Sequence, residues 1–296
     1  MQGVAVPVSM VAGDSFIHRL NPIAKLVWVV GVMVISFATR NPLFLLALTG
    51  SGLVLVTIAG IWRPFSRVML ILLPVASSLI VFQSVAPAFP RPWTPITSVG
   101  PFTIYQEGIY SGLSLLSRAV SMTVFALVMI MTTHPSDLFA SLTRLRVPYV
   151  AGFMLTMTLQ LIPVLQREIA IVMSAQKSRG MKSTGFAAVV PSFVPVFAGA
   201  IERVQQLSIS LESRAFGSSG RKTSYRRVAV RPVDWLVGFL GVAFTVGCLA
   251  VFITHDFLDI SRTLVFPPAL AMVLVGTAAV AFIGFVASAL WLISRA

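Results

Sequence analysis

Hydrophobic residues along this chain are gathered into long apolar segments, separated by short polar or proline-containing breaks. A helix needs about 20 apolar residues to cross the hydrocarbon core of a bilayer. Segments of roughly that length occupy residues 23–39, 43–62, 68–86, 105–131, 233–254 and 264–294. The pattern predicts an all-α integral membrane protein with about six transmembrane helices.

The breaks between these segments carry their own local signals. Arg40-Asn41-Pro42 ends the first segment, because helices usually stop before a proline. Residues 62–67 (Trp-Arg-Pro-Phe-Ser-Arg) read as a short basic loop with an interfacial aromatic. Five prolines between residues 87 and 102 predict a loop there and exclude a helix.

The central region, residues 132–231, differs in character from the rest of the chain. It carries 13 of the 22 Lys and Arg residues and only four acidic residues. A helix start is expected around Pro135, followed by an amphipathic helix over 137–146. Residues 147–162 and 186–201 are apolar, and hydropathy alone allows each to be a further span or a long helix lying along the membrane. The chain is thus predicted to have three regions, 1–131, 132–232 and 233–296.

A duplicated pattern lies within this central region, between residues 163 and 220. Ser178-Arg179-Gly180 and Ser213-Arg214-Ala215 are aligned on their arginines and lie 35 residues apart. Apolar residues recur at helical spacing before each tripeptide: Leu165, Ile169, Val172 and Met173 before the first, and Val204, Leu207 and Leu211 before the second. Each segment is therefore predicted to be an amphipathic helix with an arginine near its C-terminal end and a glycine, Gly180 or Gly217, as a stop.

Composition and charge agree with a membrane location. The chain of 296 residues is 57% hydrophobic and 10% charged, whereas soluble domains carry about 25% charged residues. A net charge of +13 could suit a nucleic-acid partner, but the high apolar content argues instead for charge arranged by membrane topology and for acidic partners. The predicted spans place 18 basic residues on one side and three, Arg40, Arg91 and Arg262, on the other, with Arg118 inside a span. Because basic residues stay in the cytoplasm, both termini and the central region are expected there.

No set of residues typical of catalysis or metal binding emerges from the sequence. Cys248 is the single cysteine. Residues 217–223 resemble a phosphate-binding loop, but Arg221 stands where glycine is required, so a flexible basic linker is the interpretation. His255, Asp256 and Asp259 are interpreted as a solvated loop rather than a metal site. No nucleophile has a base beside it, so the chain is expected to be non-catalytic.

The duplicated arginine pattern resembles the two Ala-Arg-Gly-like coupling motifs of the transmembrane T component of energy-coupling-factor (ECF) transporters. These are ABC-type importers of vitamins and transition metal ions. Residues 14–25 are also similar to the pattern His-Arg-Leu-Asp-Pro…Lys that opens this family, with Asn21 in place of the aspartate. The resemblance covers roughly residues 14–224.

The resemblance implies a non-catalytic membrane scaffold in the cell membrane of a prokaryote. Its partners would be two ABC ATPase subunits, which bind ATP and Mg, and a small membrane-embedded substrate-binding subunit; the chain itself would hold no cofactor. Residues 147–162 and 186–201 would belong to long coupling helices at the membrane surface. The residues implied in ATPase coupling are Ser178, Arg179, Gly180, Ser213, Arg214 and Ala215. Those implied in contact with the substrate-binding subunit are Leu165, Ile169, Val172, Met173, Val204, Leu207 and Leu211.

Two other classes of function would require features that the sequence does not show. A stand-alone secondary transporter or channel would need polar groups in several spans and an inverted repeat of spans, and only Arg118 is found. A membrane enzyme acting on lipid phosphates would need an acid–base or nucleophile set. The sequence does not name the substrate, and the resemblance implies that another subunit selects it.

Overall fold

A computed structural model of the chain describes residues 13–87, 94–99, 102–142, 149–180, 186–218, 230–254 and 267–294. Contacts divide it into two compact units, residues 1–134 with 229–296, and residues 135–228. The first unit contains α1 (Phe16–Arg19), α2 (Pro22–Ala38), α3 (Pro42–Ala59), α4 (Trp62–Val85), β1 (Pro95–Val99), β2 (Phe102–Tyr105), α5 (Gln106–Thr132), α9 (Pro232–Thr254) and α10 (Pro268–Ser294). The second contains α6 (Pro135–Leu142), α7 (Tyr149–Ser178) and α8 (Phe186–Ser213).

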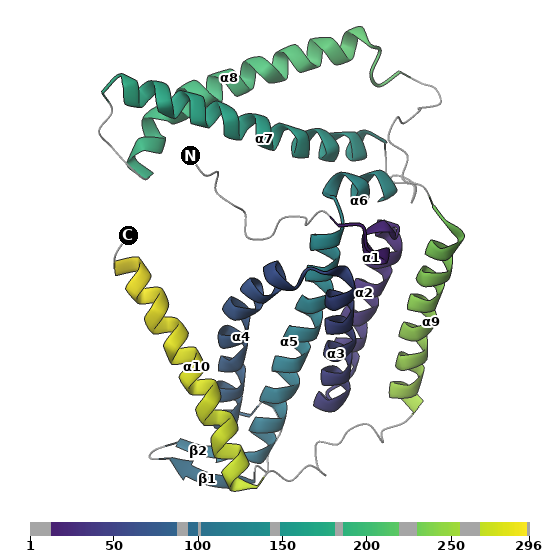
Figure 1. Cartoon of the computed structure of the whole chain (residues 1–296), viewed down its shortest axis with the longest axis vertical. Coiled ribbons are helices and arrows are strands. Elements are labelled where there is room, and N and C mark those ends of the chain that lie inside the picture. Colours follow the sequence, from purple (N-terminus) through teal and green to yellow (C-terminus); the bar gives the residue numbers. More distant parts are fainter. Residues whose placement is uncertain are drawn as a thin grey trace. The chain divides into compact units, whose positions relative to one another are not determined.

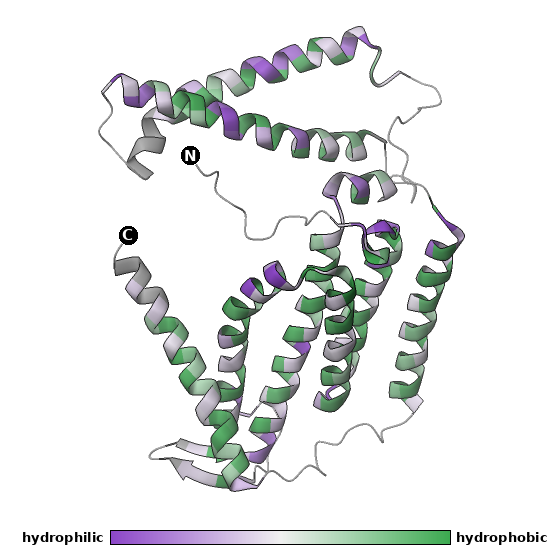
Figure 2. Cartoon of the chain, in the orientation of Figure 1, coloured by the Kyte–Doolittle hydropathy of each residue, from purple (hydrophilic) through white to green (hydrophobic). Residues whose placement is uncertain are grey.

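The predicted all-α membrane protein is confirmed. Within the described residues, six helices are long and apolar enough to cross a membrane: α3, α4, α5, residues 150–178 of α7, α9, and residues 268–288 of α10. Helix α2 is also apolar but has only 17 residues. Figure 2 shows hydrophobic residues over most of α2 to α5, α9 and α10. The position of α7 along the membrane surface stays a prediction.

Helix α5 is the centre of the first unit and packs against α2, α3 and α4 (Figure 1). Its closest approach is to α4, through Gly108 and Gly112, which are four residues apart on one face. A Cβ at Gly108 would overlap the carbonyl oxygen of Gln83, and one at Gly112 would lie 2.7 Å from Ile80 Cα. Small residues at this spacing let two membrane helices come into backbone contact. The side chains packed around α5 form two apolar clusters, which include Val56, Phe65, Val124 and Met131, and Val32, Ile35, Leu48 and Phe125.

Two Asn-Pro pairs begin α2 and α3. Asn21 Oδ1 accepts a hydrogen bond from Ile23 N at 3.0 Å, and Asn41 Oδ1 accepts one from Leu43 N at 2.9 Å. Each asparagine thus caps a helix whose first residue is proline, a position where no backbone N–H is needed. Helix α2 begins at Pro22, one residue before the predicted segment 23–39, and the break predicted at 40–42 is confirmed.

The predicted basic loop at residues 62–67 is wrong, because α4 begins at Trp62. Phe65 is buried against the cluster around α5, so the segment gains apolar contacts by becoming helical. Pro64 falls in the first turn, where its missing N–H costs no intrahelical hydrogen bond.

The predicted loop at 87–102 is also partly wrong. Its described part forms β1, which pairs antiparallel with β2. Pro95 is tolerated because it is the first residue of its strand. The hairpin is held to the bundle by Ile104, which is buried with Ile109 and Ala271.

The two C-terminal helices dock on different parts of the bundle. Helix α9 packs on α2, and α10 packs on α4; Figure 1 shows them on opposite sides of the unit. Trp28 Nε1 donates to Val237 O at 3.0 Å, and Ser77 Oγ donates to Ala278 O at 3.2 Å. Gly31 leaves room for the side chain of Thr245.

Asp234 ties the start of α9 to the start of α2. Its Oδ1 accepts from Asn21 N at 2.9 Å, and its Oδ2 accepts from Arg231 N at 2.7 Å. Asp234 is buried, and these two backbone N–H groups satisfy both oxygens of its carboxylate.

Lys25 connects α2 to the C-terminal end of α5. Its buried ammonium donates to Thr132 O at 3.0 Å, Thr132 Oγ1 at 3.2 Å and Thr133 Oγ1 at 3.0 Å. A cation at a helix C-terminus is stabilised by the free carbonyl groups and the helix dipole. Lys25 therefore fixes the last turn of α5, directly before the chain leaves the first unit.

Arg118 lies within α5, as predicted, and contacts a neighbouring helix connection. Its Nη2 donates to Thr39 O at 2.9 Å, and its guanidinium carbon lies 5.4 Å from the centre of the Phe37 ring. The carbonyl and the aromatic face compensate part of the cost of an arginine inside a span. Arg118 thus holds the α2–α3 connection against α5.

Candidate functional site: two matched helix ends

The duplicated pattern falls on two long helices that pack against each other. Helix α7 has 30 residues and α8 has 28, and they cross in Figure 1. The ring of Phe153, near the start of α7, lies 4.5 Å from that of Phe216, just past the end of α8. The pair is therefore antiparallel. At 1.5 Å per residue, roughly 38 Å of helix separates Phe153 from Ser178, so the two C-terminal ends lie at opposite ends of the pair.

The half-buried positions by which α7 and α8 contact each other, here called their contact faces, are 35 residues apart in sequence, as the two arginines are. Half-buried positions on α7 include 161, 164, 165, 168, 172 and 176, beside others such as 157 and 173, and those on the described part of α8 are 196, 199, 200, 203, 207 and 211. The six α7 positions named first have counterparts on α8. Each number in the second set is 35 higher than its counterpart in the first. The two helices thus use equivalent faces to contact each other, as expected of a duplicated segment packed on itself.

An ion pair joins two equivalent positions of this duplication. Glu168 on α7 accepts a hydrogen bond from Arg203 Nη2 on α8, and the two residues are 35 apart. Equivalent residues meet where two related helices cross, so identical charges there would repel. Opposite charges at this point favour the observed crossing over other registers. The pair was not among the residues predicted from the sequence, because it depends on how the two helices cross.

Both helices end in the same backbone conformation. Gly180 has φ +90° and its N–H donates to Lys177 O; Ala215 has φ +54° and its N–H donates to Glu212 O. In α8 the pattern is completed by Phe216 N, which donates to Leu211 O at 3.0 Å. In α8 this is a Schellman motif. The left-handed residue and the equivalent hydrogen bond that both helices share place Arg179 and Arg214 at matching C-cap positions.

The six residues implied in ATPase coupling are all exposed at these two ends. Among the described residues, neither the Arg179 nor the Arg214 guanidinium has a hydrogen-bond or ion-pair partner. The two serine hydroxyls form hydrogen bonds within their own helices: Ser178 Oγ donates to Ser174 O, and Ser213 Oγ donates to Ser210 O. The arginines are therefore the groups at these ends that are available to a partner.

The residues implied in contact with the substrate-binding subunit are divided between two surroundings. Leu165, Val172, Met173, Leu207 and Leu211 are half-buried, and four of these five positions belong to the contact faces of α7 and α8. Ile169 and Val204 are exposed, at 40% and 57%. Other exposed apolar residues on the same helices, not predicted from the sequence, include Ile171, Phe193, Val194, Phe197, Ile201 and Ile209.

A glycine at position 215 is expected to stabilise the end of α8. Ala215 occupies the left-handed region, where an L-residue costs roughly 1 kcal/mol more than glycine. Ala215→Gly should raise the free energy of unfolding by up to about 1 kcal/mol, less the greater entropy of glycine in the unfolded chain. Thermal unfolding of the purified protein measures this. Gly180→Ala is the matched control, and it should destabilise α7; a lower melting temperature for Ala215→Gly would contradict the assigned cap.

Metal and phosphate chemistry find little support in the described part of the chain. It contains no group of three or more His, Cys, Asp or Glu residues placed to hold a metal ion. His255, Asp256 and Asp259 lie outside the described residues. The loop that resembles a phosphate-binding site is described only at Gly217 and Ser218.

Comparison with known proteins identifies relatives of most of the chain. The family model of CbiQ, described as a cobalt transport protein, matches residues 13–225. The energy-coupling factor transporter transmembrane protein EcfT of Leuconostoc gelidum subsp. gasicomitatum is 31% identical over 257 residues, covering 80% of this chain and 94% of the relative. The proteins of the same name from Streptococcus thermophilus and Bacillus subtilis are each 28% identical, covering 74% of this chain and 87% of the relative. These relatives are transmembrane subunits of transporters.

Proposed function

Because the chain belongs to the CbiQ family and is a transmembrane T component of the energy-coupling-factor type, we propose that it couples two ATPase subunits to a substrate-binding membrane subunit. Motion driven by ATP would pass through α7 and α8 and lead to uptake of a vitamin or a transition metal ion. The chain acts as a non-catalytic scaffold, and ATP and Mg are bound by the ATPases. The observation that carries the proposal is the pair of exposed C-cap arginines, Arg179 and Arg214. They stand at the C-terminal ends of α7 and α8, which lie at opposite ends of the antiparallel helix pair.

The geometry of α7 and α8 supports this role physically. A coupling element must be stiff, and each helix is about 42–45 Å long at 1.5 Å per residue. The ion pair of Glu168 and Arg203 joins the helices at their crossing. Arginine offers a planar fork that binds carboxylates and carbonyls with two parallel hydrogen bonds. Two ends therefore match two ATPase subunits, and exposed apolar residues such as Ile169 and Val204 remain for the substrate-binding subunit.

Co-purification tests the proposal directly. Tagged full-length chain, isolated from its native membrane, should retain proteins with ATP-binding motifs, and that complex should hydrolyse ATP. The chain purified alone should show no hydrolysis, because it lacks a phosphate-binding loop. Hydrolysis by the isolated chain, or a transport-competent chain with no ATPase partner, would exclude the scaffold function.

We further propose that both termini and the second unit face the cytoplasm, on the basis of the 18-to-3 distribution of basic residues. In a Cys248→Ala background, cysteines placed at Ser98 and Ser218 should label from opposite sides of the membrane. Both positions are exposed in the structure. Ser218→Cys should react only after the membrane is made permeable. Labelling of both cysteines in intact cells would contradict this orientation.

A further inference from the structure

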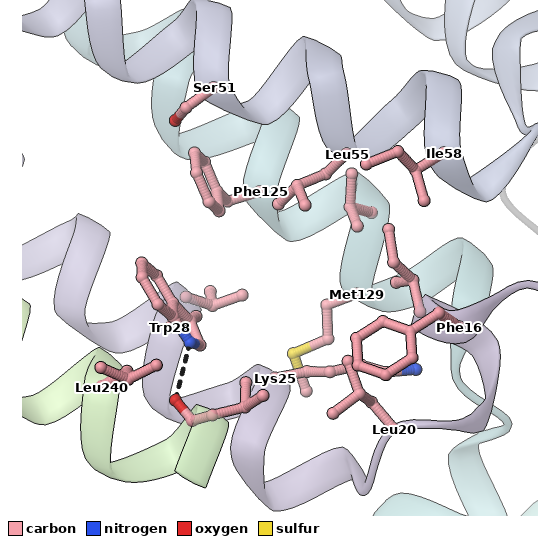
Figure 3. Close-up of a pocket in the computed structure, with 14 residues that line it drawn as sticks. Phe16, Leu20, Lys25, Trp28, Ser51, Leu55, Ile58, Phe125, Met129 and Leu240 are labelled. Atoms are coloured by element: carbon pink, nitrogen blue, oxygen red, sulfur yellow. Dashed lines mark hydrogen bonds between the residues drawn. The ribbon is translucent and has the colours of Figure 1, made fainter. Parts of the chain in front are cut away.

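An apolar cavity of about 420 Å³ lies in the first unit, lined by residues of α1, α2, α3, α5 and α9 (Figure 3). Its inner wall includes the buried residues Phe125 and Val128. Its rim includes Phe16, Ile58 and Leu240, which are 58%, 53% and 51% exposed. The cavity is therefore open at the outside of the bundle, where span-length apolar helices are surrounded by lipid.

The few polar groups in the wall of this cavity already have partners. The Lys25 ammonium is turned toward Thr132 and Thr133, so only the aliphatic part of its side chain faces the cavity. Trp28 Nε1 donates to Val237 O, shown as a dashed line in Figure 3, and Ser51 Oγ donates to Leu48 O. A cavity without unsatisfied polar groups does not retain ordered water. In a membrane, the material suited to fill it is hydrocarbon.

A polar cavity of about 280 Å³ adjoins the apolar one and shares Phe16 and Leu20 with it. Its charged residues are Asp14, Arg19, Arg231 and Asp234. Both Asp234 oxygens accept backbone N–H groups, and Asp14 is 97% exposed and 3.9 Å from Arg19. The guanidinium groups of Arg19 and Arg231 are the cations in the wall of this cavity, and an anion is the ligand that suits them.

We propose that the two cavities together bind one anionic glycerophospholipid. One acyl chain lies in the apolar cavity, and the phosphate lies in the polar cavity between the guanidinium groups of Arg19 and Arg231. Arginine suits a phosphate because its planar fork donates two parallel hydrogen bonds. Basic pockets between transmembrane helices are a known setting for anionic headgroups. The lipid would join α9 to α1 and α2. Asp234 already connects the start of α9 to the start of α2 at this place.

Native mass spectrometry of the purified full-length chain, titrated with phosphatidylglycerol, tests the headgroup contact. Removing both cations with Arg19→Gln and Arg231→Gln should weaken binding about 30-fold, since each basic residue near an anionic lipid contributes roughly a fivefold effect. The matched control is Arg63→Gln with Arg67→Gln, which removes the same charge from exposed positions of α4 outside both cavities. It should leave binding nearly unchanged. An equal loss in the control would mean general attraction to the membrane, and the proposal would be wrong.

Blocking the apolar cavity tests the acyl chain. Leu240→Trp should fill the entrance and weaken phosphatidylglycerol binding at least tenfold, whereas Leu236→Trp, one turn earlier on α9 and outside the lining, should not. Ile58→Trp on the opposite rim repeats the test if Leu240→Trp does not fold. Glycerol phosphate, which has no acyl chain, should not compete. Unchanged binding in folded rim variants would overturn the proposal, and would indicate that another part of the chain fills the cavity.

Discussion

Replacing Gly108 and Gly112 together by alanine should prevent α4 and α5 from packing, with little folded protein recovered. The new Cβ at position 108 would overlap the carbonyl oxygen of Gln83 and lie 2.8 Å from Ser84 Cα. These are backbone atoms, so no side chain can rotate away. Overpacking costs about 1–3 kcal/mol per site, and two sites on one interface bring the loss to roughly 2–6 kcal/mol, a large part of a typical stability.

Size-exclusion profiles and thermal unfolding of the purified variants would measure this loss. Gly50→Ala is the control, because Gly50 lies in α3 with nothing within 4 Å of an added Cβ. Alanine should be neutral or slightly stabilising there, by up to about 1 kcal/mol. Normal yield and melting temperature for the Gly108 and Gly112 variants would show that α4 and α5 are not in backbone contact.

The membrane spans could be predicted because hydropathy reports directly on the medium around a helix. The Asn21-Pro22 and Asn41-Pro42 boundaries could be predicted too, since capping depends on neighbouring residues only. The loop predicted at residues 62–67 was wrong because a contact between distant residues, not the local sequence, decides the conformation there. Two arginines and a proline suggested a loop, but the burial of Phe65 against α5 decides the conformation, and that contact is remote in sequence.

The candidate site also combines features set by neighbouring residues with features set by contacts remote in sequence. Local residues indicated where α7 and α8 end, and the structure adds that Arg179 and Arg214 occupy the same C-cap position. The pairing of Glu168 with Arg203 depends on how the helices cross, and a single helical pattern does not contain that information. The contact between Asn21 and Asp234 joins residues 213 apart, and no local signal predicts it.

The Gly108-x-x-x-Gly112 spacing is a different case, because its signal was present in the sequence. Two glycines four residues apart in an apolar helix are typical of close helix packing in membranes. Prolines likewise concealed β1 and β2, although strands accept a proline at their first residue. The spacing of small residues indicates the close contact of α4 and α5, and the alternation of apolar and polar residues indicates the strands. Hydropathy alone reports neither feature.

Alanine at Arg179 or Arg214 should weaken docking of the ATPase subunits or uncouple hydrolysis from uptake. Either variant should leave the chain folded, because both side chains are exposed and have no partner among the described residues. Hydrogen bonds to charged groups contribute about 1.5–3 kcal/mol, so each loss should weaken docking roughly ten- to a hundredfold. Lysine should restore little, because it lacks the planar fork of arginine. Binding of purified ATPases and uptake into vesicles measure the two effects.

The double variant distinguishes two separate contacts from one shared contact. The arginines lie at opposite ends of an antiparallel helix pair, so each should engage its own ATPase subunit. Effects at distant sites with no shared partner add in free energy, so the double variant should lose roughly the product of the two single losses. Lys177→Ala, an exposed cation two residues before Arg179, controls for mere loss of charge. If both arginine variants dock and transport as the parent does, or if Lys177→Ala is equally impaired, these two helix ends do not act as specific coupling contacts.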